Sequence, residues 1–224
     1  MPTILITGAG RGLGLELARQ YAADGWRVIG TVRDAKGKAA VEKLGADAPV
    51  VDVTSLNEVK WLASGLKGTP IDVLFCNAGI TGRKGMTLGS FDFAEWERIL
   101  RVNLLGAAAV TEALIENVAA SERKVVAMMS SRLGSISEMR GETLPYATSK
   151  AALNALAKGL AVTLASRGII VVALSPGWVR TGMGGKGAPL APETSVRGLR
   201  KVIPGLKPSD SGKFLSYDGS TIQW

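Results

Sequence analysis

The chain contains no histidine among its 224 residues. Serine–histidine–aspartate triads and metal sites built on imidazole are therefore excluded. Its single cysteine, Cys76, allows no disulfide within the chain, and such cysteine usage suits a reducing compartment. We therefore expect a cytoplasmic protein without a metal centre.

Long apolar segments are also missing. The sequence has no run of about 18 uninterrupted apolar residues, so no segment is expected to span a membrane. A strand-like run begins at Thr3, with no charged region and no cleavage site before it. Neither a secretory signal nor a transit peptide is therefore expected.

Clusters of basic residues are absent as well, although lysine and arginine outnumber acidic residues by 27 to 19. The resulting net charge of +8 could attract nucleic acid or an anionic ligand. The basic residues are scattered, however, and no segment combines dense positive charge with aromatic side chains. We expect no nucleic-acid or membrane partner.

Apolar, β-branched runs alternate with helical patterns along the whole chain. The runs predict strands at 3–7, 26–32, 49–53, 71–75, 124–129, 169–174 and 213–217, and helices are expected at 15–23, 36–44, 55–66, 95–118 and 146–165. No linker, charge run or repeat divides them. The alternation predicts a single α/β domain over residues 1–224, with a Rossmann fold: a doubly wound, mostly parallel sheet of about seven strands with helices on both faces.

A glycine-rich turn follows the first predicted strand and precedes the first predicted helix. Residues Gly8–Gly14 contain four glycines, which let a ligand approach the backbone, and the helix start presents free N–H groups to a pyrophosphate. Such a segment can also be a tight turn with no ligand. In the context of strand, turn and helix, the phosphate-binding interpretation is favoured.

The end of the second strand bears on the choice of dinucleotide. In this kind of sheet an acidic residue at that point would hold a ribose 2′-hydroxyl. Here Val32 is followed by Arg33, and Arg11 lies in the glycine turn, so two guanidinium groups could bind a 2′-phosphate. The pattern favours NADP(H) over NAD(H). The alternative is that Arg33 only caps a surface turn, with Asp34 as its partner.

Tyr146 and Lys150 are four residues apart and would share one face of a helix. An ammonium about 4 Å from the phenol, at an effective dielectric of about 20, would favour the phenolate by roughly 4 kcal/mol. The phenol, with a reference pKa of about 10, could then exchange protons nearer neutrality. Alone, two residues at helical spacing are a weak motif, and an aromatic side chain beside a solvated lysine is the commoner case.

Further polar points follow later strands, at residues 77–79, 130–131 and 176–181. In open parallel sheets ligands bind outside the carboxyl ends of the strands, so these points should converge on one crevice. Asn103 lies in the middle of a predicted helix, where asparagine is unfavourable unless it has a specific task.

Taken together, these motifs resemble the short-chain dehydrogenase/reductase family over essentially the whole chain. The matches occur in the family's order: Thr7 with Gly8–Gly14, Asp52, Asn77–Gly79, Asn103, Ser131, Tyr146 with Lys150, and Pro176–Thr181. Within that family the chain resembles the small C-factor and sniffer-type carbonyl reductases, through Leu133–Ile136, Pro176–Val179, Thr181–Gly185 and the final segment ending at Trp224.

The resemblance implies a catalytic set of Asn103, Ser131, Tyr146 and Lys150. Tyr146 would be the general acid/base, Lys150 would lower its pKa and bind the nicotinamide ribose, Ser131 would donate to the substrate oxygen, and Asn103 would hold a water that links Lys150 to solvent. Local alternatives exist: Ser131 as a turn residue, Asn103 as a helix-bending amide and Asp52 as a cap.

The resemblance also implies a cofactor-binding set, in which Asp52 and Val53 would meet the adenine and Val179 and Thr181 would orient the carboxamide. The full set is Gly8, Gly10, Arg11, Gly12, Leu13, Gly14, Arg33, Asp52, Val53, Asn77, Ala78, Gly79, Tyr146, Lys150, Pro176, Gly177, Val179 and Thr181.

Three features depart from the family pattern. Cys76 replaces the first asparagine of the usual Asn-Asn-Ala-Gly and is expected to be a buried, unreactive side chain. The gap between Ser131 and Tyr146 is longer than usual, which leaves the choice between Ser130 and Ser131 open. Residues 182–187 are mostly glycine and predict a small or mobile lid.

The sequence therefore predicts an NADPH-dependent carbonyl reductase for a small or aromatic ketone, aldehyde or quinone. Its substrate pocket would be apolar, lined by Leu133, Met139, Trp178 and Met183. The alternative is a cofactor-binding signalling or regulatory protein of the C-factor type with little turnover. The resemblance further implies a homodimer or homotetramer, formed through the helices that carry Asn103 and Tyr146.

Overall fold

The computed structural model describes residues 1–83, 85–141 and 143–224. Within them, six strands form one parallel sheet in the order β2-β1-β3-β4-β5-β6. The strands are β1 (Thr3–Ile6), β2 (Arg27–Gly30), β3 (Val73–Cys76), β4 (Val125–Met129), β5 (Ile170–Ser175) and β6 (Phe214–Ser216). The strand order reverses direction between β1 and β3, as in doubly wound sheets.

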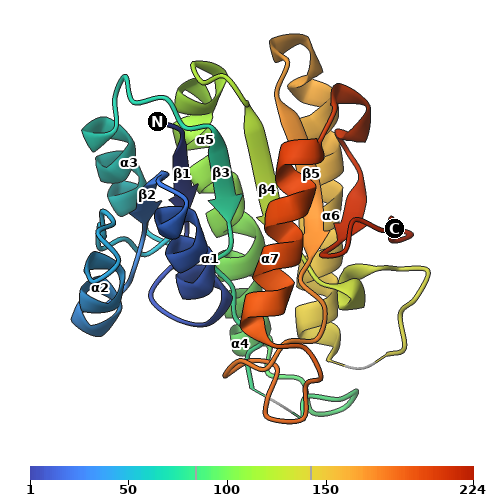
Figure 1. The fold of residues 1–224 in the computed structure, drawn as a ribbon. Helices are drawn as coiled ribbons and strands as arrows, with labels where there is room; N and C mark the ends of the chain where they lie inside the picture. The colour runs from blue at the N-terminus through green and yellow to red at the C-terminus, as the bar shows by residue number, and fades with distance from the viewer. Residues whose placement is uncertain (84, 142) are drawn as a thin grey trace.

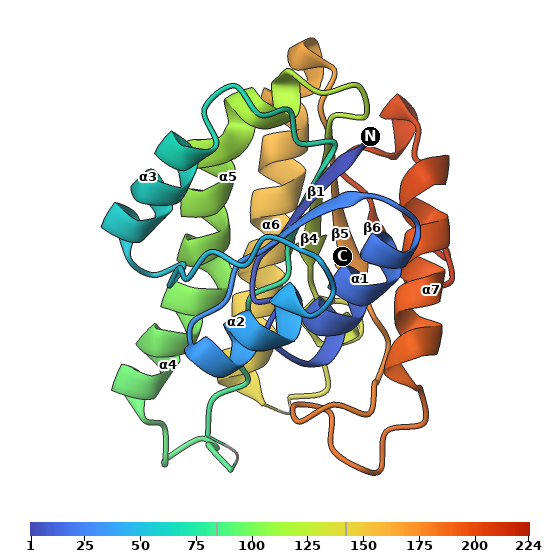
Figure 2. The same cartoon turned by 60° about the vertical axis from the view of Figure 1, so that its left-hand side comes forward.

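Helices cover both faces of the sheet (Figures 1 and 2). The side chains of α1 (Gly12–Ala23), α2 (Ala35–Glu42) and α7 (Pro192–Val202) share one core cluster with the sheet. Those of α3 (Leu56–Gly65), α5 (Gly106–Ala119) and α6 (Leu144–Thr163) share the other. The predicted Rossmann-type architecture is confirmed.

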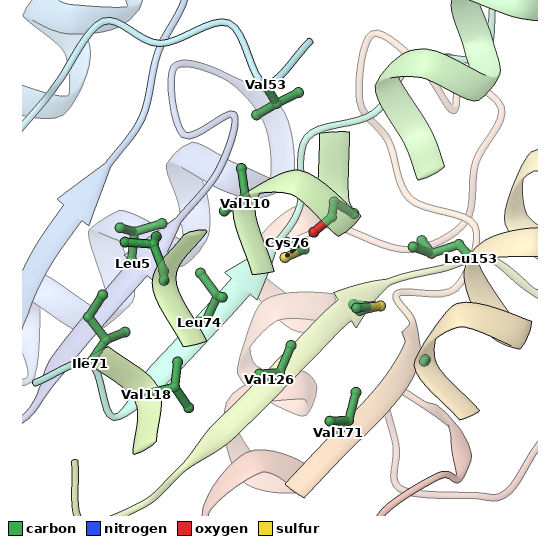
Figure 3. Packing of buried hydrophobic residues seen from close by; sticks show 14 of the residues in the cluster. Leu5, Val53, Ile71, Leu74, Cys76, Val110, Val118, Val126, Leu153 and Val171 are labelled. Carbon is green, nitrogen blue, oxygen red and sulfur yellow. Dashed lines mark hydrogen bonds between the residues drawn. The ribbon is translucent and has the colours of Figure 1, made fainter. Parts of the chain in front are cut away.

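Buried strands explain why the sequence shows continuous apolar runs rather than alternation. Every residue of β1, β3, β4 and β5 is buried, because helices cover both sides. Figure 3 shows the cluster beneath α5, where Val110 lies near Cys76 and Leu74 of β3. Cys76 lies inside this cluster, as predicted for an unreactive side chain.

The predicted third strand at 49–53 is wrong, and this accounts for the count of six strands rather than seven. Residues 47–50 meet β2 and the residues just after it only through isolated bridges, Ile29 with Asp47 and Val32 with Val50. Pro49 lies between the bridging residues and has no N–H to continue a ladder. The strand predicted at 213–217 does exist as β6, at the edge beside β5.

The long helix predicted at 95–118 is interrupted. The helix α4 (Phe93–Leu100) continues into a π-helical turn, Arg101–Leu105, before α5 begins. Asn103 lies in that turn. The helix carrying Tyr146 runs from Leu144 to Thr163, with Pro145 in its first turn as expected.

The polar segment between Ser131 and Tyr146 begins with a short 3-10 helix, Arg132–Gly134, and includes residue 142, which lies outside the described residues. No helix in the described ranges is both long and apolar enough to cross a membrane.

Candidate active site

The loops that follow β3, β4 and β5 gather at the carboxyl edge of the sheet, the lower edge in Figure 1. The glycine turn after β1 opens at the same edge, because parallel strands end on the same side. The polar motifs therefore lie at one edge of the sheet, as predicted.

The glycine turn packs against the residues after β3. The Asn77 amide nitrogen donates to the carbonyls of Thr7 (2.9 Å) and Gly8 (3.2 Å), and the Thr7 hydroxyl accepts the N–H groups of Asn77 and Ala78, each at 3.0 Å. A Cβ on Gly14 would lie 2.3 Å from the Gly8 carbonyl oxygen, so only glycine fits there. Among the described residues no side chain caps the start of α1, which leaves its first N–H groups free for an anion.

Asn103 joins the loop after β3 to α6. Its side chain accepts the Ile80 N–H at 2.8 Å and donates to the Ile80 carbonyl and the Ser149 hydroxyl, each at 2.9 Å. Gly79 lies between Asn103 and Lys150, since a Cβ there would be 3.3 Å from Asn103 Oδ1 and 3.5 Å from Lys150 Nζ. The local alternative for Asn103 therefore has support: the amide has a structural task at a π-helical turn, a kind of turn that is frequent at functional sites.

Ser131, Tyr146 and Lys150 meet at the end of β4. The Ser131 hydroxyl lies close enough to the Tyr146 phenol to affect its pKa, and the buried Lys150 ammonium donates to the Met129 carbonyl at 2.7 Å. Ser130, by contrast, is buried and donates to Asn154 Oδ1 at 2.5 Å. The geometry thus favours Ser131 over Ser130 as the serine that faces the tyrosine.

Electrostatics at this site differ from the expectation. Burial raises the pKa of the Tyr146 phenol to about 12, and the Ser131 hydroxyl opposes that shift. Burial also lowers the pKa of the Lys150 ammonium to about 8. The predicted lowering of the tyrosine pKa by Lys150 is wrong for this structure, because burial disfavours the charged form of the phenol. The Lys150 ammonium lies 5.8 Å from the centre of the phenol ring.

The segment after β5 folds back over the glycine turn. A Cβ on Gly12 would lie 3.8 Å from the Thr181 methyl carbon, so Thr181 reaches the start of α1. Val179 is buried and bridges to Leu190, and the Trp178 indole N–H donates to the Gly184 carbonyl at 2.9 Å. These bonds give the predicted lid a defined fold, although its composition is mostly glycine. The preceding Pro176–Gly177 turn is fixed by Ser195, whose hydroxyl donates to the Pro176 carbonyl at 2.6 Å.

The predicted adenosine end lies beside the glycine turn. A Cβ on Gly10 would be 3.4 Å from a methyl of Val32, the residue before Arg33. Arg11 and Arg33 are both exposed. Burial opposes ionisation of Asp52, but hydrogen bonds from Thr54 and, to a lesser degree, the Arg33 charge hold its pKa below the usual value.

The carboxylates of Asp34 and Asp52 both make local hydrogen bonds at this end. Asp34 is not the partner of Arg33: its carboxylate caps α2 by accepting the Gly37 N–H at 2.7 Å. Asp52 does act as a local cap, since one carboxylate oxygen accepts the Thr54 N–H at 2.8 Å and the Thr54 hydroxyl at 2.7 Å. Val53 is buried in the core beneath α5.

Cys76 is buried, and Thr7 and Asn154 make hydrogen bonds at the site that the sequence did not predict. Burial raises the pKa of Cys76 to about 11, which agrees with an inert thiol. Thr7 precedes the glycine turn and was expected to have no separate role, yet its hydroxyl links the end of β1 to the residues after β3. Asn154 gave only a weak signal, as an amide in an otherwise apolar helical run four residues beyond Lys150.

Comparison with known proteins agrees with this arrangement. A family model described as short chain dehydrogenase matches residues 2–189. The C-signal of Myxococcus xanthus is 40% identical over 156 residues, which cover 69% of this chain and 93% of that protein.

Two solved structures have the same fold over the whole chain. The NADPH-bound carbonyl reductase from chicken fatty liver superposes with a TM-score of 0.92 at 29% identity, covering 100% of this chain and 99% of the other. The carbonyl reductase Sniffer of D. melanogaster also has a TM-score of 0.92, at 32% identity and complete coverage of both chains. The chain therefore belongs to the short-chain dehydrogenase family of nicotinamide-dependent oxidoreductases.

Proposed function

We propose that this oxidoreductase is an NADPH-dependent carbonyl reductase acting on a small or aromatic ketone, aldehyde or quinone. The observation that carries the proposal is the arrangement at the end of β4, where Ser131 faces Tyr146 and the buried Lys150 lies one helical turn away. A hydroxyl and a phenol directed at one point form a donor pair for a developing alkoxide. Similarity to two carbonyl reductases supports the same reaction class.

The residues at the edge of the sheet fit a dinucleotide. Small residues line the path from the glycine turn to Gly79, and the uncapped start of α1 suits the pyrophosphate. Two exposed guanidinium groups, on Arg11 and Arg33, suit a 2′-phosphate, while the carboxylate of Asp34 is already bound to the backbone of α2. The remaining cofactor contacts are proposed to come from the residues set out above.

When bound, the nicotinamide supplies or accepts the hydride. The protein's part is to position the substrate and move one proton. In the reducing direction the Tyr146 phenol gives its proton to the carbonyl oxygen as the alkoxide forms, and the Ser131 hydroxyl holds that oxygen by a hydrogen bond. Lys150 holds the ribose. Its ammonium also stabilises the phenolate that remains, which is reprotonated from solvent by way of the Asn103 region.

A titration of NADPH and NADH followed by a carbonyl panel tests this proposal. Purified protein should bind NADPH more tightly than NADH and oxidise it in the presence of at least one aldehyde, ketone or quinone. The Arg33→Ala variant should lose the preference for NADPH, because one phosphate ligand is removed, while NADH binding stays the same. Absence of turnover with every carbonyl would contradict the reductase proposal.

A second candidate function is supported by the similarity to the C-signal. A cofactor-binding regulatory protein with little turnover would show a thermal shift with NADPH and no carbonyl activity. The same two measurements therefore separate the candidates, and the geometry around Tyr146 favours the enzyme.

A further inference from the structure

Three polar side chains lie along one face of α6 at intervals of four residues: Tyr146, Lys150 and Asn154. All three are buried, and all three contact the end of β4 or the turn after it. Tyr146 faces Ser131, and Lys150 donates to the Met129 carbonyl. Asn154 has no role in the proposed reaction, so its buried contacts must have another function.

Asn154 binds the chain on both sides of Ser131. Its Oδ1 accepts the Ser130 hydroxyl at 2.5 Å, and its Nδ2 donates to the Gly134 carbonyl at 3.0 Å. Asn154 is 3% exposed and Ser130 is 2% exposed, so water does not compete for these bonds. A single carboxamide thus fixes the residue before Ser131 and the turn that follows it.

The turn itself is pressed against the backbone of α6. A Cβ on Gly134 would lie 2.7 Å from the Lys150 carbonyl carbon and 3.0 Å from the Ala151 nitrogen. The same turn closes on Ser131, because the Gly134 N–H donates to the Ser131 carbonyl at 2.8 Å and the Leu133 N–H to its hydroxyl at 3.2 Å. A displacement of Gly134 would therefore move the Ser131 hydroxyl directly.

We propose that Asn154 is a positioning residue that holds the Ser131 hydroxyl in line with Tyr146. The proposal rests on the function proposed above, in which these two groups share the substrate oxygen. A hydrogen-bond donor in a reacting site must be held within about 0.5 Å, and a misplacement of about 1 Å can lower the rate by about a hundredfold. Asn154 supplies that restraint from the helix that also carries the tyrosine.

A double-mutant cycle on turnover tests the proposal. In the otherwise unchanged protein, Asn154→Ala should lower kcat/KM for the best carbonyl at least tenfold, mainly through kcat, with NADPH affinity unchanged. In the Ser131→Ala background the same substitution should change kcat/KM less than twofold, since there is no hydroxyl left to position. Ser130→Ala, which removes only one of the two bonds and leaves α6 unaltered, should give a smaller loss in the same direction.

Asn117→Ala is the matched control. Asn117 is also a buried carboxamide with two backbone bonds, to Leu66 and Thr69 at 2.6 and 2.8 Å, but it lies on α5 and contacts none of the proposed catalytic residues. It should lower stability and leave kcat unchanged.

Two outcomes would overturn the inference. If Asn154→Ala lowers kcat/KM by the same factor with and without the Ser131 hydroxyl, Asn154 has a role in overall folding instead. The proposed function would then stand. Full activity of Ser131→Ala itself would overturn both the proposed function and the inference. If Asn154→Ala does not fold, the cycle is run with Ser130→Ala and judged by the same two outcomes.

Discussion

At the scale of single residues, Lys150 shows how burial controls charge. Its ammonium is buried and its pKa is lowered to about 8, while in the unfolded chain a lysine titrates near 10.4. A group with a depressed folded pKa contributes its full stability above the unfolded pKa, and that contribution is lost as the pH falls through the folded pKa. The folded protein should therefore gain stability as the pH rises from about 8 towards 10.4, by at most about 3 kcal/mol.

The Lys150→Met variant should lack this gain. Its unfolding free energy, measured by urea denaturation between pH 7.5 and 10, should change less with pH than that of the unaltered protein. Below pH 8 the variant should be the more stable of the two, because the charged amine no longer has to be buried. Lys158→Met, at an exposed position of the same helix, should follow the unaltered protein. If the unfolding free energies of Lys150→Met and the unaltered protein changed equally with pH, the depressed pKa of Lys150 would be contradicted.

The residues of the site were predictable to different degrees. Tyr146 and Lys150 belong to a spaced motif and were predicted as site residues, whereas the sequence left the choice between Ser130 and Ser131 open. The partners that fix these residues were not predicted, because the bonds of Asn154 to Ser130 and of Asn103 to Ile80 depend on the distance between elements far apart in the chain. The sequence also predicted the wrong direction for the pKa shift of Tyr146. Spacing along a helix indicates a neighbouring group but not how deeply the side chain is buried.

At the scale of elements, the glycine turn depends on close backbone contact. A side chain on Gly14 would collide with the Gly8 carbonyl and with the Asn77 amide nitrogen, 2.6 Å away. Gly14→Ala should therefore abolish NADPH binding and destabilise the fold by more than about 2 kcal/mol. Gly159→Ala is the control: it is exposed in the middle of α6 with nothing near its Cβ position, and it should stabilise the fold by roughly 0.5–1 kcal/mol. Thermal unfolding with and without NADPH measures both, and equal effects of the two substitutions would contradict the account.

The π-helical turn allows a second prediction at this scale. Asn103→Ala would leave the Ile80 N–H and carbonyl without their side-chain partners, at a cost of about 1–3 kcal/mol for each group that stays buried. The segment after β3 should then open locally. Amide hydrogen exchange should show Ile80 losing protection while the strand amides of β4 keep theirs. Unchanged protection at Ile80 would mean that the Asn103 bonds do not hold the loop.

Elements were predictable where one physical signal dominated. Predominantly apolar runs identified all six strands, the short β6 included, and the phosphate turn followed from glycine spacing. The segment at 49–53 has the same apolar composition, but Pro49 interrupts its pairing with β2. The helix α7 was not predicted, because its sequence is rich in polar and charged residues and buries only Ser195, Val196 and Leu199.

At the scale of the whole molecule, the helices carrying Asn103 and Tyr146 leave apolar side chains uncovered. Leu105, at the end of the π-helical turn, is 55% exposed, and Val162, near the end of α6, is 71% exposed. We propose that these helices form the contact of a homodimer or homotetramer, as the family resemblance implies. Burying such side chains between copies would remove apolar surface from water.

Charge at that face should dissociate the assembly. Leu105→Glu and Val162→Glu should each shift the protein to a smaller species in light scattering after size-exclusion chromatography. Trp61→Glu, at an exposed apolar position on α3, is the control and should leave the size unchanged. A single species of monomer mass for the unaltered protein would contradict the proposed contact.

The central claim is that Tyr146 transfers the proton to the carbonyl oxygen, and single-turnover oxidation of bound NADPH by a carbonyl measures it most directly. Tyr146→Phe removes one hydroxyl from a buried ring and should leave the fold intact, and the NADPH concentration is set to saturate each protein. The account predicts that the rate falls by about a hundredfold or more, as for loss of a general acid. Equal rates for Tyr146→Phe and the unaltered protein would contradict it.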